Sequence, residues 1–527
     1  MGGALSLSDL SAPAVAAGSL KGARVVVLGA GRTGLAVAEY ASAHGAIVTL
    51  YDSAEAETLQ AATDRLASGD ITLAFGVGAA LPPLLATADL VVHSPSVTLG
   101  FPSVKASVAG PLRDYAARAI SPEGDASRRA ALLISEPEWT LRLLGSRWRI
   151  GVTGTKGKTS TSNLIATILA ADPTSPVVLG GNNGVPLIGQ ASDLSDATRV
   201  VLELSELQLP TIVSGVDVAV YTNITVDHLD RHGSVEGYRK VKRLLADRVH
   251  PDGVLIVNLD DPVTAGLAGI GRVATLGYRR DRPVPGGVGI VDGWIVAAGV
   301  PRATRFGGGV AGTGPGGRIM PVDEIALHGD HSISNVLAAI SAGLVAGVAP
   351  DAIRTAVSGF RGLPHRLETV GVLDGIRYVN DAQATQPDAV AAAVRSFRKP
   401  LVLLAGGRSK GLDLTELAPI IAAQCSGVVL FGELADELEG LFRGAGLHRI
   451  DRATSIPDAA ARGGAMARAL LTEAKDSANG SIYESEARAT VLLSPIGSSF
   501  DMFNNPFGAR GDAFRAAVLE LPAEHRA

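Results

Sequence analysis

Two glycine-rich turns, each between an apolar segment and a helix-like segment, constrain the fold of this chain most. The first apolar segment is residues 25–28, and it runs into Gly29-Ala30-Gly31-Arg32-Thr33-Gly34. The second is residues 149–152, and it runs into Thr153-Gly154-Thr155-Lys156-Gly157-Lys158-Thr159. Continuous apolar strands are typical of parallel sheets that helices cover on both faces. The two strand–turn–helix patterns therefore predict an α/β protein.

The chain is long enough for about three to four domains at roughly 150 residues each. Its apolar, strand-like segments fall into three groups: 24–28, 47–51 and 88–92; 149–152, 199–204, 216–221 and 254–257; 376–379, 401–404, 428–431 and 490–493. We predict a Rossmann-like domain over 1–132, a central ATPase-like domain with a parallel or mixed sheet over 133–362, and a C-terminal Rossmann-like domain over 363–527. The Gly- and Pro-rich stretch 283–317 is predicted to form loops or a small hairpin.

Composition and charge exclude several functional classes. The formal net charge of -5 leaves no basic surplus, which argues against a nucleic-acid partner and against an anionic membrane surface. The single cysteine, Cys425, has no partner for a disulfide and is predicted to be a buried apolar residue in a reducing compartment. The apolar run 336–348 is too short to span a bilayer and is predicted to be a buried helix. We expect a cytoplasmic, monomeric protein without a membrane span.

The first glycine turn matches the fingerprint of dinucleotide-binding proteins. It follows a strand and opens a helix, and Asp52 ends the next strand. Taken alone, this pattern predicts the binding of NAD, since the glycines allow a phosphate to approach the helix N-terminus. The same geometry suits any diphosphate, and nothing downstream is suited to hydride transfer. A different nucleotide diphosphate is the preferred interpretation, with NAD and a tight turn without ligand as the alternatives.

The second glycine turn is suited to the phosphates of ATP. Backbone N–H groups would surround the β- and γ-phosphates, Lys158 would neutralise them, and the Thr159 hydroxyl would reach Mg²⁺. The turn is not the standard eight-residue phosphate loop, because that pattern requires glycine where this chain has Val152.

The compressed turn resembles the ATP loop of the Mur ligase and folylpolyglutamate synthetase superfamily. Three further segments are similar to motifs of that superfamily: Gly180-Gly181-Asn182-Asn183-Gly184, Glu203-Leu204-Ser205-Glu206-Leu207-Gln208-Leu209, and Asn223-Ile224-Thr225-Val226-Asp227-His228-Leu229-Asp230-Arg231-His232. In the second of these, the superfamily has Glu-Leu-Ser-Ser-Phe-Gln-Leu.

The resemblance implies an ATP site with two Mg²⁺ ions. ATP would be held by Gly154, Thr155, Lys156, Gly157, Lys158 and Thr159. Phosphoryl transfer to a carboxylate brings two anions together, so the site needs cations. Thr159, Glu203, His228 and a carbamylated Lys242 are the implied metal ligands, and Lys158, His228, Lys242 and Arg366 the implied catalytic residues. The carbamylation of Lys242 follows from the resemblance alone.

Segments in the last third of the chain resemble the amino-acid-adding part of these enzymes. Leu363-Pro364-His365-Arg366-Leu367-Glu368 resembles a His-Arg turn that places Arg366 at the γ-phosphate. The resemblance implies that Asn335 contacts adenine, although Ser332 replaces a second expected asparagine. Asn380-Asp381-Ala382-Gln383-Ala384-Thr385-Gln386 resembles the D-glutamate-adding branch, with Asp381 at the ribose and Gln383 in place of a lysine. The implied amino-acid contacts are Thr385, Lys410, Ser499 and Phe500.

The same resemblance assigns the first glycine turn to a UDP-linked substrate. The implied contacts are Arg32, Thr33, Asp52, Ser53, Ser94, Ser96, Asn183 and Gln208. The expected reaction is ATP-dependent coupling of D-glutamate to UDP-N-acetylmuramoyl-L-alanine through an acyl phosphate, as in peptidoglycan precursor synthesis. Another amino-acid-adding ligase, an NAD oxidoreductase and a non-catalytic nucleotide-binding protein are the alternatives.

Overall fold

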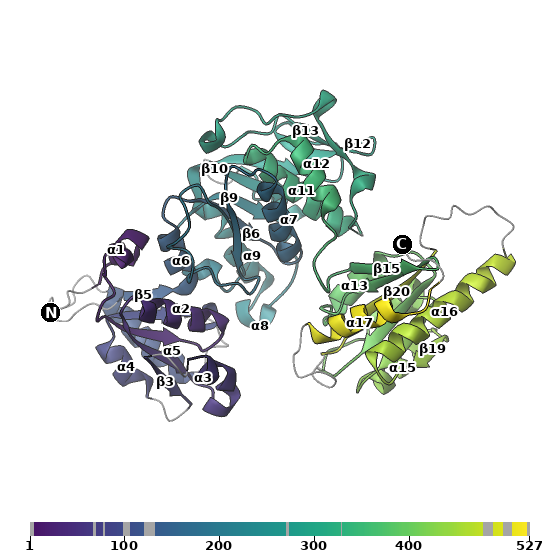
Figure 1. Ribbon diagram of the computed structural model, residues 1–527, viewed down its shortest axis with the longest axis horizontal. Coiled ribbons are helices and arrows are strands. Elements are labelled where there is room, and N and C mark those ends of the chain that lie inside the picture. Colours follow the sequence, from purple (N-terminus) through teal and green to yellow (C-terminus); the bar gives the residue numbers. More distant parts are fainter. Residues whose placement is uncertain are drawn as a thin grey trace. The chain divides into compact units, whose positions relative to one another are not determined.

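The computed structural model describes residues 5–66, 70–76, 80–97, 106–120, 132–269, 273–327, 329–409, 411–477, 488–498 and 508–523. Its contacts divide the chain into two compact units. The first unit comprises Met1–Val322 and Ser334–Val357, and the second comprises Asp323–Ile333 and Ser358–Ala527. Within the described residues the first unit holds two sheets and the second unit holds one (Figure 1).

The first sheet is parallel throughout and has the strand order β3-β2-β1-β4-β5. Its strands are β1 (Arg24–Leu28), β2 (Ile47–Asp52), β3 (Ile71–Phe75), β4 (Leu90–His93) and β5 (Leu132–Ser135). The accompanying helices are α1 (Ala12–Ala16), α2 (Arg32–Ala43), α3 (Gln60–Leu66), α4 (Leu81–Thr87) and α5 (Ala106–Ile120). Val25 and Val27 face the core beneath α2, whereas Val26 and Leu28 face α4 and α5. Both faces are therefore covered, as the continuous apolar strand predicts.

The second sheet has the order β14-β13-β12-β11-β10-β9-β6-β8-β7. It is parallel from β7 to β12, and only β13 and β14 add antiparallel pairs. Its strands are β6 (Trp148–Thr153), β7 (Val177–Gly181), β8 (Arg199–Glu203), β9 (Val216–Tyr221), β10 (Val249–Asn258), β11 (Ala274–Tyr278), β12 (Gly287–Val291), β13 (Trp294–Ala298) and β14 (Arg318–Pro321). The hairpin β12–β13 confirms the predicted hairpin within 283–317.

Helices α6 to α12 belong to the segment around this second sheet. They are α6 (Glu136–Leu144), α7 (Lys158–Ala170), α8 (Leu229–His232), α9 (Val235–Arg243), α10 (Pro262–Ala265), α11 (Asp330–Val345) and α12 (Pro350–Gly359). Residues 336–345 of α11 are almost all fully buried, which confirms the prediction of a buried apolar helix there. In the part of the chain that the structure describes, no helix is both long and apolar enough to cross a bilayer.

The third sheet, in the second unit, has the order β15-β16-β20-β17-β18-β19 with one antiparallel pair, β15–β16. Its strands are β15 (Glu368–Leu373), β16 (Ile376–Asn380), β17 (Leu401–Gly406), β18 (Gly427–Phe431), β19 (Ile450–Arg452) and β20 (Ala489–Ile496). One face packs on α13 (Pro387–Arg395), α14 (Leu417–Gln424) and α15 (Ala435–Gly444), and the other on α16 (Ile456–Ser477) and α17 (Ala509–Glu520). The three sheets confirm the predicted α/β class.

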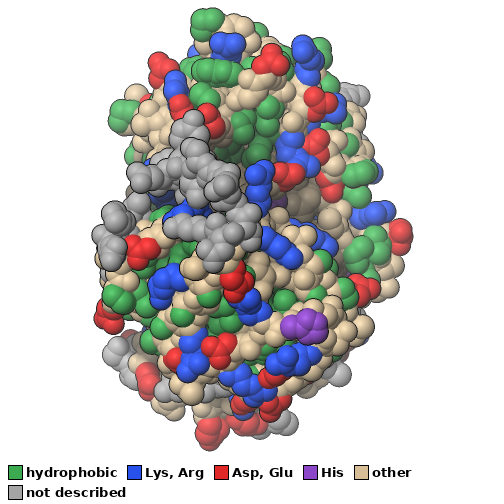
Figure 2. Space-filling model, turned by 90° about the vertical axis from the view of Figure 1, so that its right-hand side faces the viewer, with side chains coloured by type: hydrophobic (Ala, Val, Ile, Leu, Met, Phe, Trp, Pro, Cys, Tyr) green, Lys and Arg blue, Asp and Glu red, His purple; other side chains and the backbone are tan. Residues whose placement is uncertain are grey.

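Cys425, directly after α14, is 1% exposed, and burial raises the pKa of its thiol to about 12. The predicted burial of this residue is therefore confirmed, and a neutral buried thiol packs as a small apolar group. On the face that Figure 2 shows, Lys and Arg side chains are interspersed with Asp and Glu side chains. Exposed pairs such as Arg452–Glu439 and Arg462–Asp458 contribute little individually to stability.

Helix α6 joins the first sheet to the second. It begins directly after β5, where the hydroxyl of Ser135 accepts a hydrogen bond from the Glu138 backbone N–H at 3.2 Å. Trp139 is fully buried; its indole Nε1 donates to the Leu10 carbonyl at 3.2 Å, and its ring meets that of Tyr40 edge to face. A single apolar cluster around this helix contains residues of both sheets. The predicted boundary at 132/133 falls within β5, so the first sheet continues slightly beyond it.

Replacing Trp139 by alanine is expected to lower the free energy of unfolding by about 3–5 kcal/mol, because it removes a large buried ring and leaves a cavity. Trp294→Ala is the matched control, since Trp294 lies partly exposed at the antiparallel end of the second sheet. Urea unfolding of both variants, followed by circular dichroism, measures the difference. Equal losses for the two variants would contradict a special role of Trp139 between the sheets.

Candidate active site

The second glycine turn connects β6 to α7 and is held from two sides. The Thr155 backbone N–H donates to the Asn223 carbonyl at 2.8 Å, and its hydroxyl lies 3.0 Å from the Tyr238 hydroxyl. Gly157 has φ +84°, and a Cβ there would lie 2.5 Å from Oδ1 of Asn335. Only glycine fits this backbone without strain. These contacts hold the turn in place, and Asn335, an expected adenine contact, packs directly against it.

Lys158, the first residue of α7, folds back over the turn. Its Nζ donates to the carbonyl oxygens of Gly154 at 3.0 Å and of Thr155 at 2.9 Å. Burial lowers the pKa of this amine, while the carboxylates of Glu203 and Glu206 oppose that effect. Both of these acceptors are neutral, so an anion placed in the turn would gain a strong partner in this lysine. Lys156 instead points outward and pairs with Asp227 at 3.3 Å.

Glu203 ends β8 beside the turn and has an unsatisfied oxygen. The side chain is 1% exposed, and its Oε1 accepts from Asn182 Nδ2 at 2.8 Å. Its Oε2 is buried without a hydrogen-bond partner. A buried carboxylate oxygen without a donor is costly unless a cation reaches it. Thr159, in the first turn of α7, supplies a hydroxyl of the kind that Mg²⁺ accepts as a ligand. These residues fit the expected metal.

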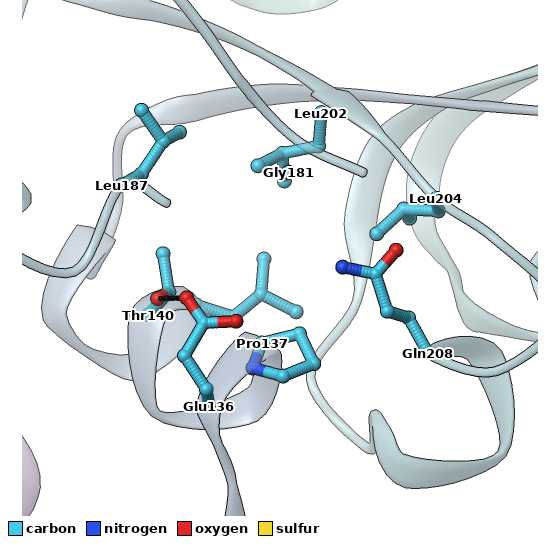
Figure 3. A pocket seen from close by; sticks show the side chains of 9 residues that line it. Glu136, Pro137, Thr140, Gly181, Leu187, Leu202, Leu204 and Gln208 are labelled. Atoms are coloured by element: carbon cyan, nitrogen blue, oxygen red, sulfur yellow. Dashed lines mark hydrogen bonds between the residues drawn. The ribbon is translucent and has the colours of Figure 1, made fainter. Parts of the chain in front are cut away.

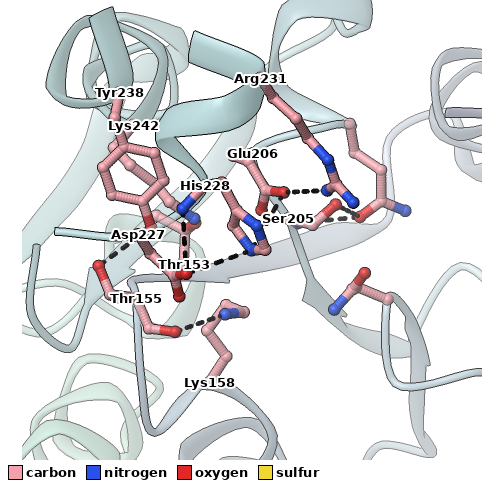
Figure 4. A network of polar contacts seen from close by, with 12 residues as sticks. Thr153, Thr155, Lys158, Ser205, Glu206, Asp227, His228, Arg231, Tyr238 and Lys242 are labelled. Carbon is pink, nitrogen blue, oxygen red and sulfur yellow. Dashed lines mark hydrogen bonds and ion pairs between the residues drawn. The ribbon is translucent and has the colours of Figure 1, made fainter. Parts of the chain in front are cut away.

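His228 lies at the centre of a charged cluster (Figure 4). It adopts a left-handed backbone conformation, with φ +51°, at the start of α8. Its Nε2 is 3.5 Å from Glu206 Oε1 and 3.9 Å from Asp227 Oδ1. Arg231 pairs with the same Glu206 oxygen at 3.2 Å. No group of three His, Cys, Asp or Glu side chains is gathered to hold a metal ion in the described ranges. Hydroxyl, phosphate and water oxygens would have to complete any Mg²⁺ site here.

Glu206 is the residue of this cluster that the sequence interpretation missed. It is only 5% exposed, and its charge acts on Lys158 and Lys242 as well as on the histidine. The sequence does contain a sign of its importance, because Glu206 stands in a recognised motif at a position where the superfamily has serine.

Lys242, on α9, is fully buried beside the same turn. Its Nζ donates to the Gly154 carbonyl at 2.9 Å and to Thr153 Oγ1 at 3.3 Å, and both of these acceptors are neutral. Burial, with Lys158 nearby, lowers the pKa of this amine to about 7. The amine is therefore partly unprotonated at neutral pH and nucleophilic.

A cavity of about 500 Å³ lies between the first glycine turn and the second sheet. Seven of the predicted contacts to a UDP-linked substrate line it: Arg32, Thr33, Asp52, Ser53, Ser94, Ser96 and Gln208. Asn183 does not line it, whereas its neighbours Asn182 and Gly184 do. The oxygen Oδ1 of Asn183 accepts from the Val185 backbone N–H at 3.2 Å and so shapes the turn.

Asp52 uses both carboxylate oxygens on backbone groups. Oδ2 accepts from the Ala30 N–H at 2.8 Å, and Oδ1 accepts from the Ala54 N–H at 2.9 Å. The carboxylate therefore fixes the first glycine turn against the end of β2.

In the second unit, Asp381 anchors the predicted His-Arg turn. Its Oδ1 accepts from the Leu367 N–H at 3.2 Å, and its Oδ2 accepts from Ser494 Oγ at 3.1 Å. Burial raises the pKa of this carboxyl to about 7. His365 and Leu367 both have positive φ, at 64° and 45°, which leaves Arg366 on the exposed side of the turn.

Of the predicted amino-acid contacts, Thr385 belongs to the described residues. Thr385 lies between β16 and α13, shortly after Asp381. Lys410, Ser499 and Phe500 lie outside the described residues.

The sequence of the chain matches the models of three protein-domain families. "Mur ligase MurD-like, N-terminal domain" matches residues 23–111, "Mur ligase middle domain" residues 152–343 and "Mur ligase, glutamate ligase domain" residues 365–478. A UDP-N-acetylmuramoylalanine--D-glutamate ligase of Symbiobacterium thermophilum is 34% identical over 501 residues, covering 94% of this chain and 98% of the relative. The chain belongs to the Mur ligase family. Residues 23–111 of this Mur ligase thus match a domain of that family, whereas the NAD alternative rested on the first glycine turn alone.

Further comparisons agree with this assignment. The enzyme of the same name from Acidobacterium capsulatum is 34% identical to this Mur ligase over 503 residues, which cover 95% and 97% of the two chains. The crystal structure of the UDP-N-acetylmuramate-alanine ligase MurC from Thermotoga maritima matches with a TM-score of 0.52 at 16% identity. That match covers 94% of this chain and 99% of MurC, and it shows a shared fold.

The buried carboxyl of Asp381 predicts a pH dependence of stability. Its folded-state pKa of about 7 lies above the ordinary aspartate value of 3.8, so only the folded state holds the proton between these pH values. The free energy of unfolding should therefore fall as the pH rises from about 4 to 7, by on the order of 4 kcal/mol from this residue.

Asp381→Asn, which is neutral at every pH, should remove this part of the slope. Asp388→Asn, at an exposed site on α13, is the control. Denaturant unfolding at pH 5 and pH 8 measures both, and an unchanged slope in Asp381→Asn would disprove the assignment.

Proposed function

We propose that this Mur ligase joins D-glutamate to the carboxyl group of UDP-N-acetylmuramoyl-L-alanine and converts ATP to ADP and phosphate. The observation that carries the proposal is the near-full-length similarity to relatives that bear this name, at 30–34% identity. The phosphate turn beside an unsatisfied buried carboxylate, together with a large cavity at the first glycine turn, supports it.

The chemistry requires activation of a poor electrophile. The substrate carboxylate attacks the γ-phosphorus of ATP, ADP leaves, and an acyl phosphate forms. The amine of D-glutamate then attacks the acyl carbon, and the tetrahedral intermediate expels phosphate. Lys158 and the backbone N–H groups of the turn stabilise the negative charge on the phosphates. The family resemblance assigns Arg366 to the γ-phosphate, and Lys156 and Thr155 belong to the same phosphate turn as Lys158.

Thr159 and Glu203 are proposed to hold one Mg²⁺, and His228 with Lys242 a second. When bound, these ions neutralise the phosphate oxygens and orient the two reacting anions. The unsatisfied oxygen of Glu203 supports the first site. For the second, an unmodified ammonium would repel the metal, so Lys242 must carry a carbamate. Its full burial between neutral partners supports this modification.

The remaining contacts are proposed from the family resemblance. Asn335 binds adenine and Asp381 the ribose, while Thr385, Lys410, Ser499 and Phe500 bind D-glutamate. The cavity residues Arg32, Thr33, Ser53, Ser94, Ser96 and Gln208 bind the UDP-linked substrate, with Asp52 and Asn183 shaping the turns. We place the enzyme in the cytoplasm as a monomer, and the single buried thiol matches a reducing compartment.

Carbamylation is tested by isotope labelling. Enzyme incubated with ¹³C-bicarbonate at pH 8 should show one carbamate carbonyl resonance by NMR. Lys242→Arg should lack that resonance, because guanidinium groups do not form carbamates under these conditions, while Lys240→Arg, on the same helix, should retain it. A signal of equal size in Lys242→Arg would refute the proposed modification.

Substrate specificity is tested by phosphate release. With ATP, Mg²⁺ and UDP-N-acetylmuramoyl-L-alanine, turnover is expected on adding D-glutamate but not on adding L-alanine, L-lysine or diaminopimelate. Lys158→Ala should reduce kcat by at least about a hundredfold, since it removes a cation that stabilises the transferred phosphoryl group. Turnover with a different amino acid alone would support another amino-acid-adding ligase, and no turnover with any of them a non-catalytic nucleotide-binding protein.

A further inference from the structure

A second, much smaller cavity shares lining residues with the substrate cavity, and Figure 3 shows the side chains around it. Its volume is about 20 Å³, which suits a single water molecule. Gln208 and Gly181 line both the small and the large cavity. Gln208 is therefore the side chain that connects the two spaces.

The opposite wall of the small cavity carries Glu136, the first residue of α6. This carboxyl group is buried and forms no ion pair within the described part of the chain, and burial raises its pKa to about 7. One of its oxygens, Oε1, accepts from Thr140 Oγ1 at 2.8 Å. Figure 3 shows the other oxygen directed across the cavity toward the amide nitrogen of Gln208. Leucine side chains form much of the remaining wall.

The orientation of the Gln208 amide follows from its other end. Its Oε1 accepts from the Ser205 backbone N–H at 2.9 Å, which fixes the oxygen on that side and turns the NH₂ group to the cavities. An NH₂ group has two hydrogens to donate. One can serve the small cavity and the other the substrate cavity.

We propose that Glu136, through one water in the small cavity, holds the Gln208 amide in the orientation that presents its second hydrogen to the UDP-linked substrate. Glu136 is thus a positioning residue, because it does not itself line the substrate cavity. The inference rests on the proposed function only in taking the large cavity as the site of that substrate.

The first test separates substrate affinity from turnover. Glu136→Leu should raise KM for UDP-N-acetylmuramoyl-L-alanine roughly fivefold, the ratio expected for one neutral hydrogen bond, with kcat and KM for ATP within about twofold. Glu136→Gln, which keeps one acceptor oxygen, should give a smaller rise. Glu138→Gln is the matched control on the same helix, since Glu138 accepts from the Val213 and Ser214 N–H groups and lines neither cavity. A uniform fall of kcat without a change in KM would overturn the proposal.

The second test asks whether Glu136 acts through Gln208. Gln208→Ala should itself raise KM, and the double variant Glu136→Leu/Gln208→Ala should match Gln208→Ala within about twofold. Effects that multiply in the double variant would show independent action and refute the proposal. If Glu136→Leu does not fold, Glu136→Met, which has an unbranched side chain of similar length, replaces it in both tests.

Measurements of substrate affinity and of the water structure test the role of Glu136 independently of the amino-acid specificity. Calorimetric titration of UDP-N-acetylmuramoyl-L-alanine without ATP should show the same ratios of affinity, even if phosphate release fails with D-glutamate. A crystal structure should contain one water within hydrogen-bond distance of Glu136 and the Gln208 NH₂ group, and an empty cavity would contradict the inference.

Discussion

The active centre of the first unit depends on one carbonyl oxygen, that of Gly154. Two lysines donate to it, the partly buried Lys158 at 3.0 Å and the fully buried Lys242 at 2.9 Å. Two amines that share one neutral acceptor repel each other when both are charged, and the nearby carboxylates of Glu206, Asp227 and Glu203 act against that repulsion. Phosphates and a carbamate placed here would add negative charge that counters the repulsion between the two amines.

The parts of the fold that the sequence predicted well are those in which local pattern and burial agree. The central parallel strands, such as β1, β9 and β17, are continuous apolar segments and were located within one or two residues. Strands that were not predicted, such as β3, β15 and β19, are sheet-edge strands with few buried residues. Their position depends on pairing with a neighbour, which no local pattern records.

For the candidate site, too, residues in local motifs could be predicted from the sequence, whereas contacts between distant segments could not. Residues within contiguous motifs, such as Lys158 and Glu203, were named as candidates from the sequence and lie together around one turn. The roles of Glu206 and Glu136 depend on contacts with residues from other segments, Arg231 and His228 for the first and Gln208 for the second. Asp52 shows the converse. Its residue type and position were anticipated, but its oxygens bind the backbone of its own domain.

Because Trp139 is buried between the first two sheets, the first sheet does not form a hydrophobic core that is independent of the second. A chain that ended after Ser135 would contain all the strands β1 to β5, and it would still lack α6, which covers much of one face. The exposed leucines and valines on that face would favour association with other chains. The boundary between the first two domains therefore separates two sheets in the order of the chain. We nevertheless expect the two domains to unfold together as one cooperative unit.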